Sequence, residues 1–317
     1  YCIAQLMHAS RRVACAALAL YMLYPANYAD CTSFHSELPF TFLTLAGVYA
    51  FLRSRPTAAG GLFALASWMR PMGMVFLAAT LAATLCSKRQ TVMRSVRLAA
   101  GYAAVVLCLG GISWWHNGHF LYQARTGWMA LMQYSWDNDR RQDENKALFA
   151  EGGPMYQDAR CSSIEKDCLR RQSFVAWLRH NADQYLAQMP YKLAKTYVSD
   201  NTTFCAFVAD KSDPDRLYDT LCMPAMLHAL GHYNGVQTLV AVNLLLYFAL
   251  LAGFVLAVRH VSTPEQALPY LIVAIGTAVL LLAGHGETRF HIPFMPYIIT
   301  ACSCLLTRNA HEDTVVR

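Results

Sequence analysis

The chain has 317 residues, of which 56% are hydrophobic and 15% are charged, and its formal net charge is +6. Its mean hydropathy is +0.26, so it is too apolar for an ordinary soluble domain and is typical of a polytopic membrane protein. The sequence has no Walker-type loop, no Rossmann glycine pattern and no basic run with interleaved aromatic residues. We therefore expect no nucleic-acid partner.

The first residues are typical of the end of a membrane helix. The chain begins at Tyr1, and the apolar stretch "YCIAQLM" runs directly into "HASRR" without a recognisable signal peptide. We expect the first membrane helix and the first outer loop of the complete protein to precede residue 1, so that the chain is N-terminally truncated.

Seven apolar segments follow, and they differ in length. Three have the roughly 17–25 residues that a helix needs to cross a bilayer alone, namely 98–115, 237–258 and 267–284. Four are shorter or interrupted, namely 13–24, 38–52, 60–87 and 292–307. Segment 60–87 carries Arg70 and Pro71 at its centre, which predicts a re-entrant segment or a pair of short helices there.

Basic residues set the expected orientation. Arg and Lys gather at one set of connections, which the positive-inside rule places in the cytoplasm, namely Arg11, Arg12, Arg53, Arg55, Lys88, Arg89, Arg94, Arg97, Arg259 and Arg308. Ser36-Glu37, Arg70 and the 285–291 stretch then fall on the outer side, where their charged groups would converge. For 285–291, a hydrated loop with snorkelling side chains is the alternative.

The predicted fold is an all-α, polytopic transmembrane helical bundle with short or re-entrant helices and a mostly helical exoplasmic loop domain. Residues 1–115 would form the N-terminal part of the bundle, residues 116–236 the exoplasmic region, and residues 237–317 the C-terminal membrane helices. This organisation corresponds to an integral, multi-pass protein of the bacterial inner membrane, with the endoplasmic reticulum as the alternative.

The exoplasmic region contains one predicted amphipathic helix over 173–200. Its apolar stripe recurs every three or four residues, at Phe174, Leu178, Ala182, Tyr185, Met189, Leu193 and Tyr197. Pro190 is expected to kink or split this helix. The helix either lies on the membrane surface, with Lys192 or Lys195 facing lipid phosphates, or packs on a small outer domain with solvated lysines.

Four cysteines of the exoplasmic region are disulfide candidates, because an oxidising compartment permits such bonds. They are Cys161, Cys168, Cys205 and Cys222. Four cysteines allow three pairings, and we favour Cys161–Cys168 with Cys205–Cys222 because these close the shortest loops. Free thiols are the alternative.

The charged residues expected on the outer side suit chemistry on a lipid phosphate. Arginine offers planar, paired donors that match phosphate oxygens. A nearby carboxylate can serve as a general base or a metal ligand, and histidine can take either role or donate to a leaving oxygen. A leaving phosphate develops charge that fixed cations stabilise best in a poorly hydrated pocket.

Three ordered stretches resemble the polytopic GT-C glycosyltransferases, and especially the protein O-mannosyltransferases and the lipid A aminoarabinose transferase. They are "YPANYADCTSFHSELPFTFLTLAGVYAFLRSRP", "GGLFALASWMRPMG" and "GHGETRFHIPFMPYI". The shared features are Ser36-Glu37 at a helix start, Arg70-Pro71 followed by Gly73, and an E-x-R-[FY]-x-x-P-x-x-P pattern from Glu287 to Pro296. The outer helix "RRQSFVAWLRHNADQYLAQMPYKL" is also similar to one in that family.

The resemblance implies a sugar donor linked to polyprenyl or dolichyl phosphate and transfer to an acceptor hydroxyl of a lipid, glycan or protein on the exoplasmic face. Membrane lipids would be further partners. It implies donor-phosphate binding by Arg70 and Arg289, to which we add His291 and Lys192.

The resemblance also implies a catalytic pocket organised by Glu37 and Glu287, with assistance from His285. Asp30 and Glu37 are the candidates for holding a divalent metal, should the enzyme use one. The main general base of the family lies in the first outer loop, so residues 1–317 alone are expected to be inactive.

Three other functions remain open from the sequence. A glycosylphosphatidylinositol-type mannosyltransferase would also carry a Ser-Glu pair at a helix start. A transporter or flippase would explain broken segments with charge inside the membrane, although no internal repeat is visible. A structural or sensor protein would use the exoplasmic region to bind a partner.

Overall fold

The structure, a computed structural model, describes residues 1–32, 36–86, 91–123, 127–129, 131, 162–198, 235–283 and 288–307. Up to residue 131 the helices are α1 (Cys2–His8), α2 (Arg11–Leu23), α3 (Pro25–Thr32), α4 (Glu37–Leu52), α5 (Pro56–Met69), α6 (Gly73–Leu85) and α7 (Thr91–Asn117). Beyond it they are α10 (Ser163–His180), α11 (Ala182–Ala187), α12 (Met189–Tyr197), α16 (Gly235–Ala257), η1 (Val258–His260), α17 (Pro264–Ala283), η2 (Thr288–Phe294), α18 (Met295–Cys302) and η3 (Ser303–Thr307). The described residues contain no β-strand, which confirms the all-α class.

Three of the described helices are long and apolar enough to cross a membrane, namely Val92–Asn117, Ala241–His260 and Pro264–Ala283. They coincide with the three long segments expected from the sequence. Shorter apolar helices occur at Glu37–Leu52, Gly73–Leu85 and Phe290–Leu306.

Segment 60–87 forms the expected pair of short helices, α5 and α6, with the break at Arg70. Arg70 is extended, with φ −146° and ψ 133°, because a residue before proline disfavours the helical region. Helix α6 begins at Gly73, where a Cβ atom would lie 2.4 Å from the backbone nitrogen of Ser67. The glycine therefore lets the two helices meet closely at this turn.

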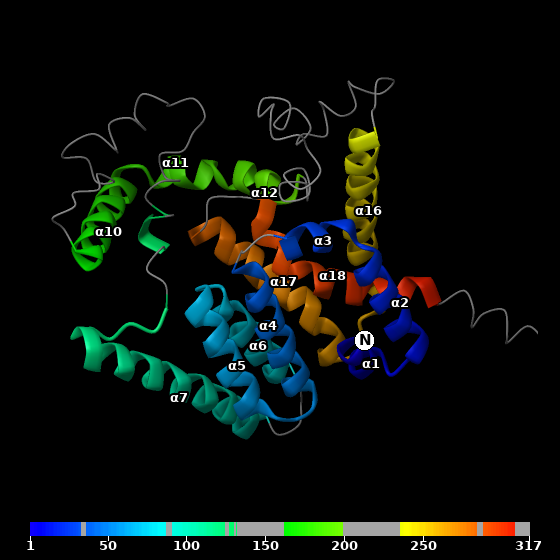
Figure 1. Cartoon of the computed structure of the whole chain (residues 1–317), viewed down its shortest axis with the longest axis horizontal. Coiled ribbons are helices and arrows are strands. Elements are labelled where there is room, and N and C mark those ends of the chain that lie inside the picture. The colour runs from blue at the N-terminus through cyan, green and yellow to red at the C-terminus, as the bar shows by residue number, and fades with distance from the viewer. Residues whose placement is uncertain are drawn as a thin grey trace, which may run out of the picture.

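Glycines also bring α5 and α7 together. A Cβ atom on Gly60 would lie 2.0 Å from the carbonyl oxygen of Leu98, and one on Gly101 would lie 2.0 Å from the carbonyl oxygen of Thr57. Small residues at such positions allow the backbones of membrane helices to approach each other. This contact holds α7 along one side of the molecule, at the lower left of Figure 1.

The core lies between α4, α5, α6 and α18, around Phe76. The ring of Phe76 lies 5.8 Å from Phe40, 6.1 Å from Phe63 and 5.6 Å from Tyr297, measured between centroids. Each of these rings is fully buried. Since they come from four helices, this aromatic cluster packs the start of α4 and the middle of α5 against α6 and α18.

In Figure 1, α11 and α12 lie across the upper part of the molecule and α10 lies at its left, and α12 contacts α17. Tyr185 donates a hydrogen bond from its hydroxyl to the carbonyl of Leu282, and the hydroxyls of Tyr197 and Thr277 are 2.6 Å apart. The expected amphipathic helix is split before Pro190, as predicted, and also at Asn181.

Candidate functional site

Glu37 and Arg70 form an ion pair at one end of the helical core. Glu37 is the first residue of α4 and is 5% exposed, and Arg70 ends α5. The guanidinium Nη1 of Arg70 binds Oε1 of Glu37. The start of α4 also favours a carboxylate, because free backbone N–H groups gather at a helix N-terminus.

A third segment completes this cluster. The guanidinium carbon of Arg70 lies 5.6 Å from the centre of the Phe290 ring, which belongs to η2. A cation near an aromatic face is attracted by the electrons of the ring. The cluster of Glu37, Arg70 and Phe290, called the Arg70 cluster below, therefore joins three parts of the chain that are distant in sequence.

The space inside the Arg70 cluster is small. A cavity of about 10 Å³ is lined by Phe40, Arg70, Met72, Phe290, Pro293 and Phe294, which is close to the volume that one water molecule needs. The side chain of Arg70 is 17% exposed. A phosphate group would therefore reach the guanidinium from its exposed edge or after displacement of Phe290.

Four expected site residues lie wholly or partly outside the described part of the chain. His285 and Glu287 lie outside the described residues, while Arg289 has a described backbone in η2, next to Phe290, but not a described side chain. The same holds for Asp30 in α3. The proposed roles of these four residues stay predictions.

His291 is placed away from the surface. It is fully buried, and its Nδ1 donates a hydrogen bond of 2.8 Å to the carbonyl oxygen of Thr196. Its ring stacks on Tyr197, with centroids 5.7 Å apart, and lies 5.1 Å from Tyr247. This placement favours a packing role, in which His291 fastens η2 to α12, over the phosphate contact expected from the sequence.

The prediction that Lys192 lies on an outer face of its helix was wrong. The sequence stripe placed Leu193 inward and Lys192 on another face, whereas Lys192 is 3% exposed and Leu193 is 42% exposed. The buried positions from α11 through Gln188 to α12 are Tyr185, Gln188, Lys192 and Thr196. Lys192 follows the buried Phe174 by about five helical turns, at about 3.6 residues per turn, so the two share one face. The stripe drawn from the sequence steps by more than about 3.6 residues on average and therefore drifts to the neighbouring positions.

Lys192 is buried, and no described residue acts as its counter-ion. Its Nζ lies 4.2 Å from the centre of the Tyr185 ring and has no hydrogen-bond partner among the described residues. Burial lowers the pKa of Lys192 from 10.5 to about 8, because an ammonium loses its hydration in an apolar surrounding. The ammonium of Lys192 is therefore not accessible to lipid phosphates at the surface.

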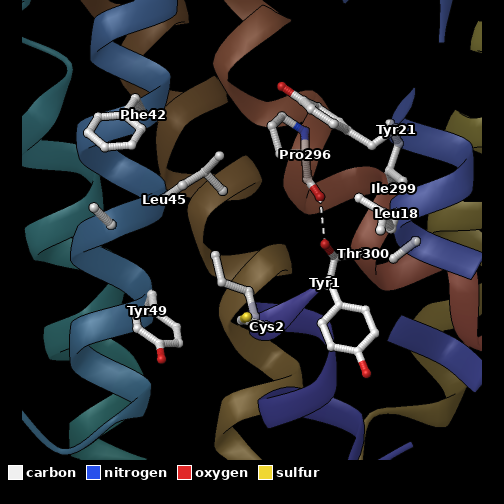
Figure 2. A pocket seen from close by; sticks show the side chains of 13 residues that line it. Tyr1, Cys2, Leu18, Tyr21, Phe42, Leu45, Tyr49, Pro296, Ile299 and Thr300 are labelled. Carbon is white, nitrogen blue, oxygen red and sulfur yellow. Dashed lines mark hydrogen bonds between the residues drawn. The ribbon is translucent and has the colours of Figure 1, made fainter. Parts of the chain in front are cut away.

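An apolar groove runs between α1, α2, α4 and α18 (Figure 2). It has a volume of about 500 Å³, and Phe42, Leu45 and Tyr49 line it along one face of α4. Most of the remaining lining is also apolar, from Tyr1, Cys2, Ile3, Ala17, Leu18, Tyr21, Ala46, Pro296, Ile299 and Thr300. Such a surface suits a hydrocarbon chain and carries none of the charged groups that chemistry on a phosphate needs.

The metal and disulfide predictions concern residues that are only partly described. The described residues hold no cluster of three metal-ligating side chains. Cys168 is exposed on α10 with a free thiol, and Cys161, Cys205 and Cys222 lie outside the described residues. The free thiol of Cys168 contradicts the expected Cys161–Cys168 bond, because a free thiol forms no disulfide, whereas Cys205–Cys222 stays a prediction.

No known protein family, curated protein or solved structure matches this chain. The functional argument therefore rests on the chain itself. Sequence reasoning brought Glu37 and Arg70 to one end of the helices but missed the contact of Phe290 with Arg70. The position of Phe290 directly after Arg289 was the available signal.

Proposed function

We propose that the protein is a multi-pass membrane glycosyltransferase that moves a sugar from a polyprenyl- or dolichyl-phosphate donor to an acceptor hydroxyl on the exoplasmic face. The observation that carries this proposal is the Arg70 cluster, in which Arg70, Glu37 and Phe290 meet at one end of apolar helices. In this proposal Arg70, together with Arg289, binds the donor phosphate, and Glu37 holds the Arg70 side chain in place.

The distribution of basic residues supports an exoplasmic location for this cluster. Glu37 and Arg53 lie at opposite ends of α4, which has 16 residues and is therefore about 24 Å long. At the Arg53 end, Arg94 donates a hydrogen bond of 2.8 Å to the carbonyl oxygen of Phe51. With the basic end in the cytoplasm, Glu37 and Arg70 lie near the opposite membrane surface.

The groove in Figure 2 supports a lipid-linked donor. Phe42 lines the groove five residues after Glu37 in α4, which is about 7 Å along the helix axis. A donor with its phosphate at Arg70 could therefore place its hydrocarbon chain in this groove. The phosphate would then remain at the membrane surface, where an acceptor hydroxyl from the aqueous phase can approach it.

Substitution of Arg70 tests this proposal. The full-length protein in lipid nanodiscs would be given a polyprenyl-phosphate sugar with a radioactive sugar, together with exoplasmic membrane acceptors, and transfer of label would be measured. Loss of one fixed donor to a developing charge typically lowers the rate by about 100-fold or more, so Arg70→Ala should reduce transfer by that factor. The control Arg53→Ala changes an arginine at the opposite end of α4 and should retain transfer. Transfer by Arg70→Ala at the wild-type rate would refute the proposal.

A lipid flippase is the second candidate, and the break between α5 and α6 at Arg70 favours it. Broken helices with charged groups are typical of transporter binding sites. In a vesicle assay, a flippase would move the lipid-linked sugar between leaflets without transferring the sugar. A glycosyltransferase would consume the donor and leave its distribution between leaflets unchanged.

A further inference from the structure

A second cavity lies beside the Arg70 cluster, on the side of α10. It has a volume of about 390 Å³, within the range of roughly 300–1,000 Å³ that is typical of small-molecule sites. Its walls are formed by residues 120–123 after α7, by Gly127, Trp128 and Leu131, and by Pro71 and Asp167. Pro71 directly follows Arg70, so this cavity adjoins the position proposed for the donor phosphate.

Two side chains of this cavity have unused hydrogen-bonding capacity. Gln123 and Asp167 both line it, and among the described residues Oε1 of Gln123 and Oδ1 of Asp167 have no hydrogen-bond partner although both atoms are buried. Buried oxygens of this kind are normally paired. A ligand that donates hydrogen bonds, such as a hydroxyl-bearing molecule, would supply the missing partners.

Aromatic rings form another part of the wall. Phe120, Tyr122 and Trp128 all line the cavity, and the centroids of Phe120 and Tyr122 are 6.4 Å apart. The faces of such rings carry negative charge and attract weakly positive C–H groups. Phe120 packs over Gly110 of α7, where a Cβ atom would lie 2.1 Å from its ring, so the glycine lets this part of the wall pack against α7.

The charge of the wall limits the class of ligand. Asp167 lines the cavity, and none of the described lining residues is a lysine or an arginine. A carboxylate repels a phosphate or another anion. A neutral ring with hydroxyl groups on its edge and C–H groups on its faces matches both the acceptor oxygens and the aromatic wall.

We propose that this cavity binds one monosaccharide unit, with Asp167 and Gln123 accepting hydrogen bonds from its hydroxyls and the aromatic rings contacting its C–H face. The inference deepens the proposed function and rests on it for the source of the sugar. Because the cavity adjoins Arg70, the unit is either the sugar of the donor or a sugar of the acceptor.

Binding of saccharides tests this inference directly. The full-length protein in nanodiscs would be titrated with methyl glycosides of mannose, glucose, galactose and N-acetylglucosamine, observed by saturation-transfer NMR. Because hydrogen bonds to a charged group are strong, Asp167→Asn should raise the dissociation constant of the glycoside by about tenfold. The control Asp183→Asn replaces an exposed carboxylate on α11 and should bind as the wild type does. Gly110→Val, a substitution in α7 that pushes the Phe120 ring out of its place in the wall, should also weaken binding of the glycoside.

A second titration separates the two sources of the sugar. If the cavity holds the donor sugar, a polyprenyl-phosphate sugar should bind more tightly than polyprenyl phosphate, and Asp167→Asn should remove this difference. If it holds an acceptor sugar, only the free glycosides should respond to Asp167→Asn.

The inference is overturned if neither the glycosides nor the lipid-linked sugar respond to Asp167→Asn, or if Asp183→Asn has the same effect. That result would leave the dependence of transfer on Arg70 intact. Conversely, unchanged transfer by Arg70→Ala would remove the proposed function but not saccharide binding.

Discussion

Replacement of Lys192 with methionine should stabilise the protein at neutral pH, and the gain should shrink as the pH rises. Lys192 is 3% exposed, and its ammonium has no hydrogen-bond partner among the described residues. A charge in such a surrounding is costly because it has lost its hydration. Methionine has a similar length and no charge, so it removes the ammonium without opening a large cavity.

The pKa of Lys192 sets the size of this effect. Its decrease from 10.5 to about 8 corresponds to about 3 kcal/mol, at roughly 1.4 kcal/mol per unit. In the unfolded chain the lysine keeps its proton up to about pH 10.5, whereas the folded protein releases it above about pH 8. The wild type therefore gains stability between these two values, because the unfolded state binds more protons there. The contact of Lys192 with the Tyr185 ring opposes the penalty by about 1 kcal/mol, so we expect a net gain of about 2 kcal/mol near pH 7.

Chemical unfolding in detergent measures this difference. Burial raises the pKa values of Tyr185 and Tyr197 above their usual value of 10.0, and both variants share these groups, so measurements from about pH 7 to about pH 9.5 isolate Lys192. Over this range the advantage of Lys192→Met should fall by about 2 kcal/mol. The control Lys195→Met, in the same helix, should show no such dependence. A difference that is independent of pH, or a loss of stability in Lys192→Met near pH 7, would refute the reasoning.

Two further predictions concern helix packing and the ion pair. Gly60→Leu should lower the free energy of unfolding by about 2 kcal/mol, because its Cβ would lie 2.0 Å from a backbone oxygen of α7. Gly111→Leu is the control, because a Cβ at Gly111 meets nothing within 4 Å. Equal effects of the two substitutions would contradict the prediction. Glu37→Gln should lower it by about 3 kcal/mol, because it leaves the Arg70 charge unpaired. Arg70→Met in the same chain should recover part of that loss in the same unfolding assay, and no recovery would show that the pair does not act as a unit.

The features that sequence predicted best depend on few neighbouring residues. The break between α5 and α6 follows from Arg70-Pro71 alone, since proline restricts the residue before it. The three long apolar helices follow from length and composition. Arg70 and Glu37 could be brought to one end because α4 and α5 are short and flanked by basic residues.

The features that sequence missed depend on helix phase and on distant contacts. The apolar stripe over 173–200 was traced with steps longer than about 3.6 residues on average, so it missed Lys192, which lies about five helical turns after the buried Phe174. The hydrogen bond from His291 to Thr196 joins residues 95 positions apart. No local pattern in the sequence specifies such a pair.

These distant contacts connect α12 to the Arg70 cluster. Thr196 in α12 accepts the hydrogen bond from His291, and the residue before His291, Phe290, lies against the guanidinium of Arg70. His291 and Phe290 both belong to the short helix η2, Thr288–Phe294, so the contact with α12 and the contact with Arg70 are made by neighbouring residues of one element. The cavity at Arg70 is only about 10 Å³, so a phosphate group binds at the exposed edge of the guanidinium or displaces Phe290. A ligand that displaces Phe290 would therefore act next to the hydrogen bond that joins η2 to α12.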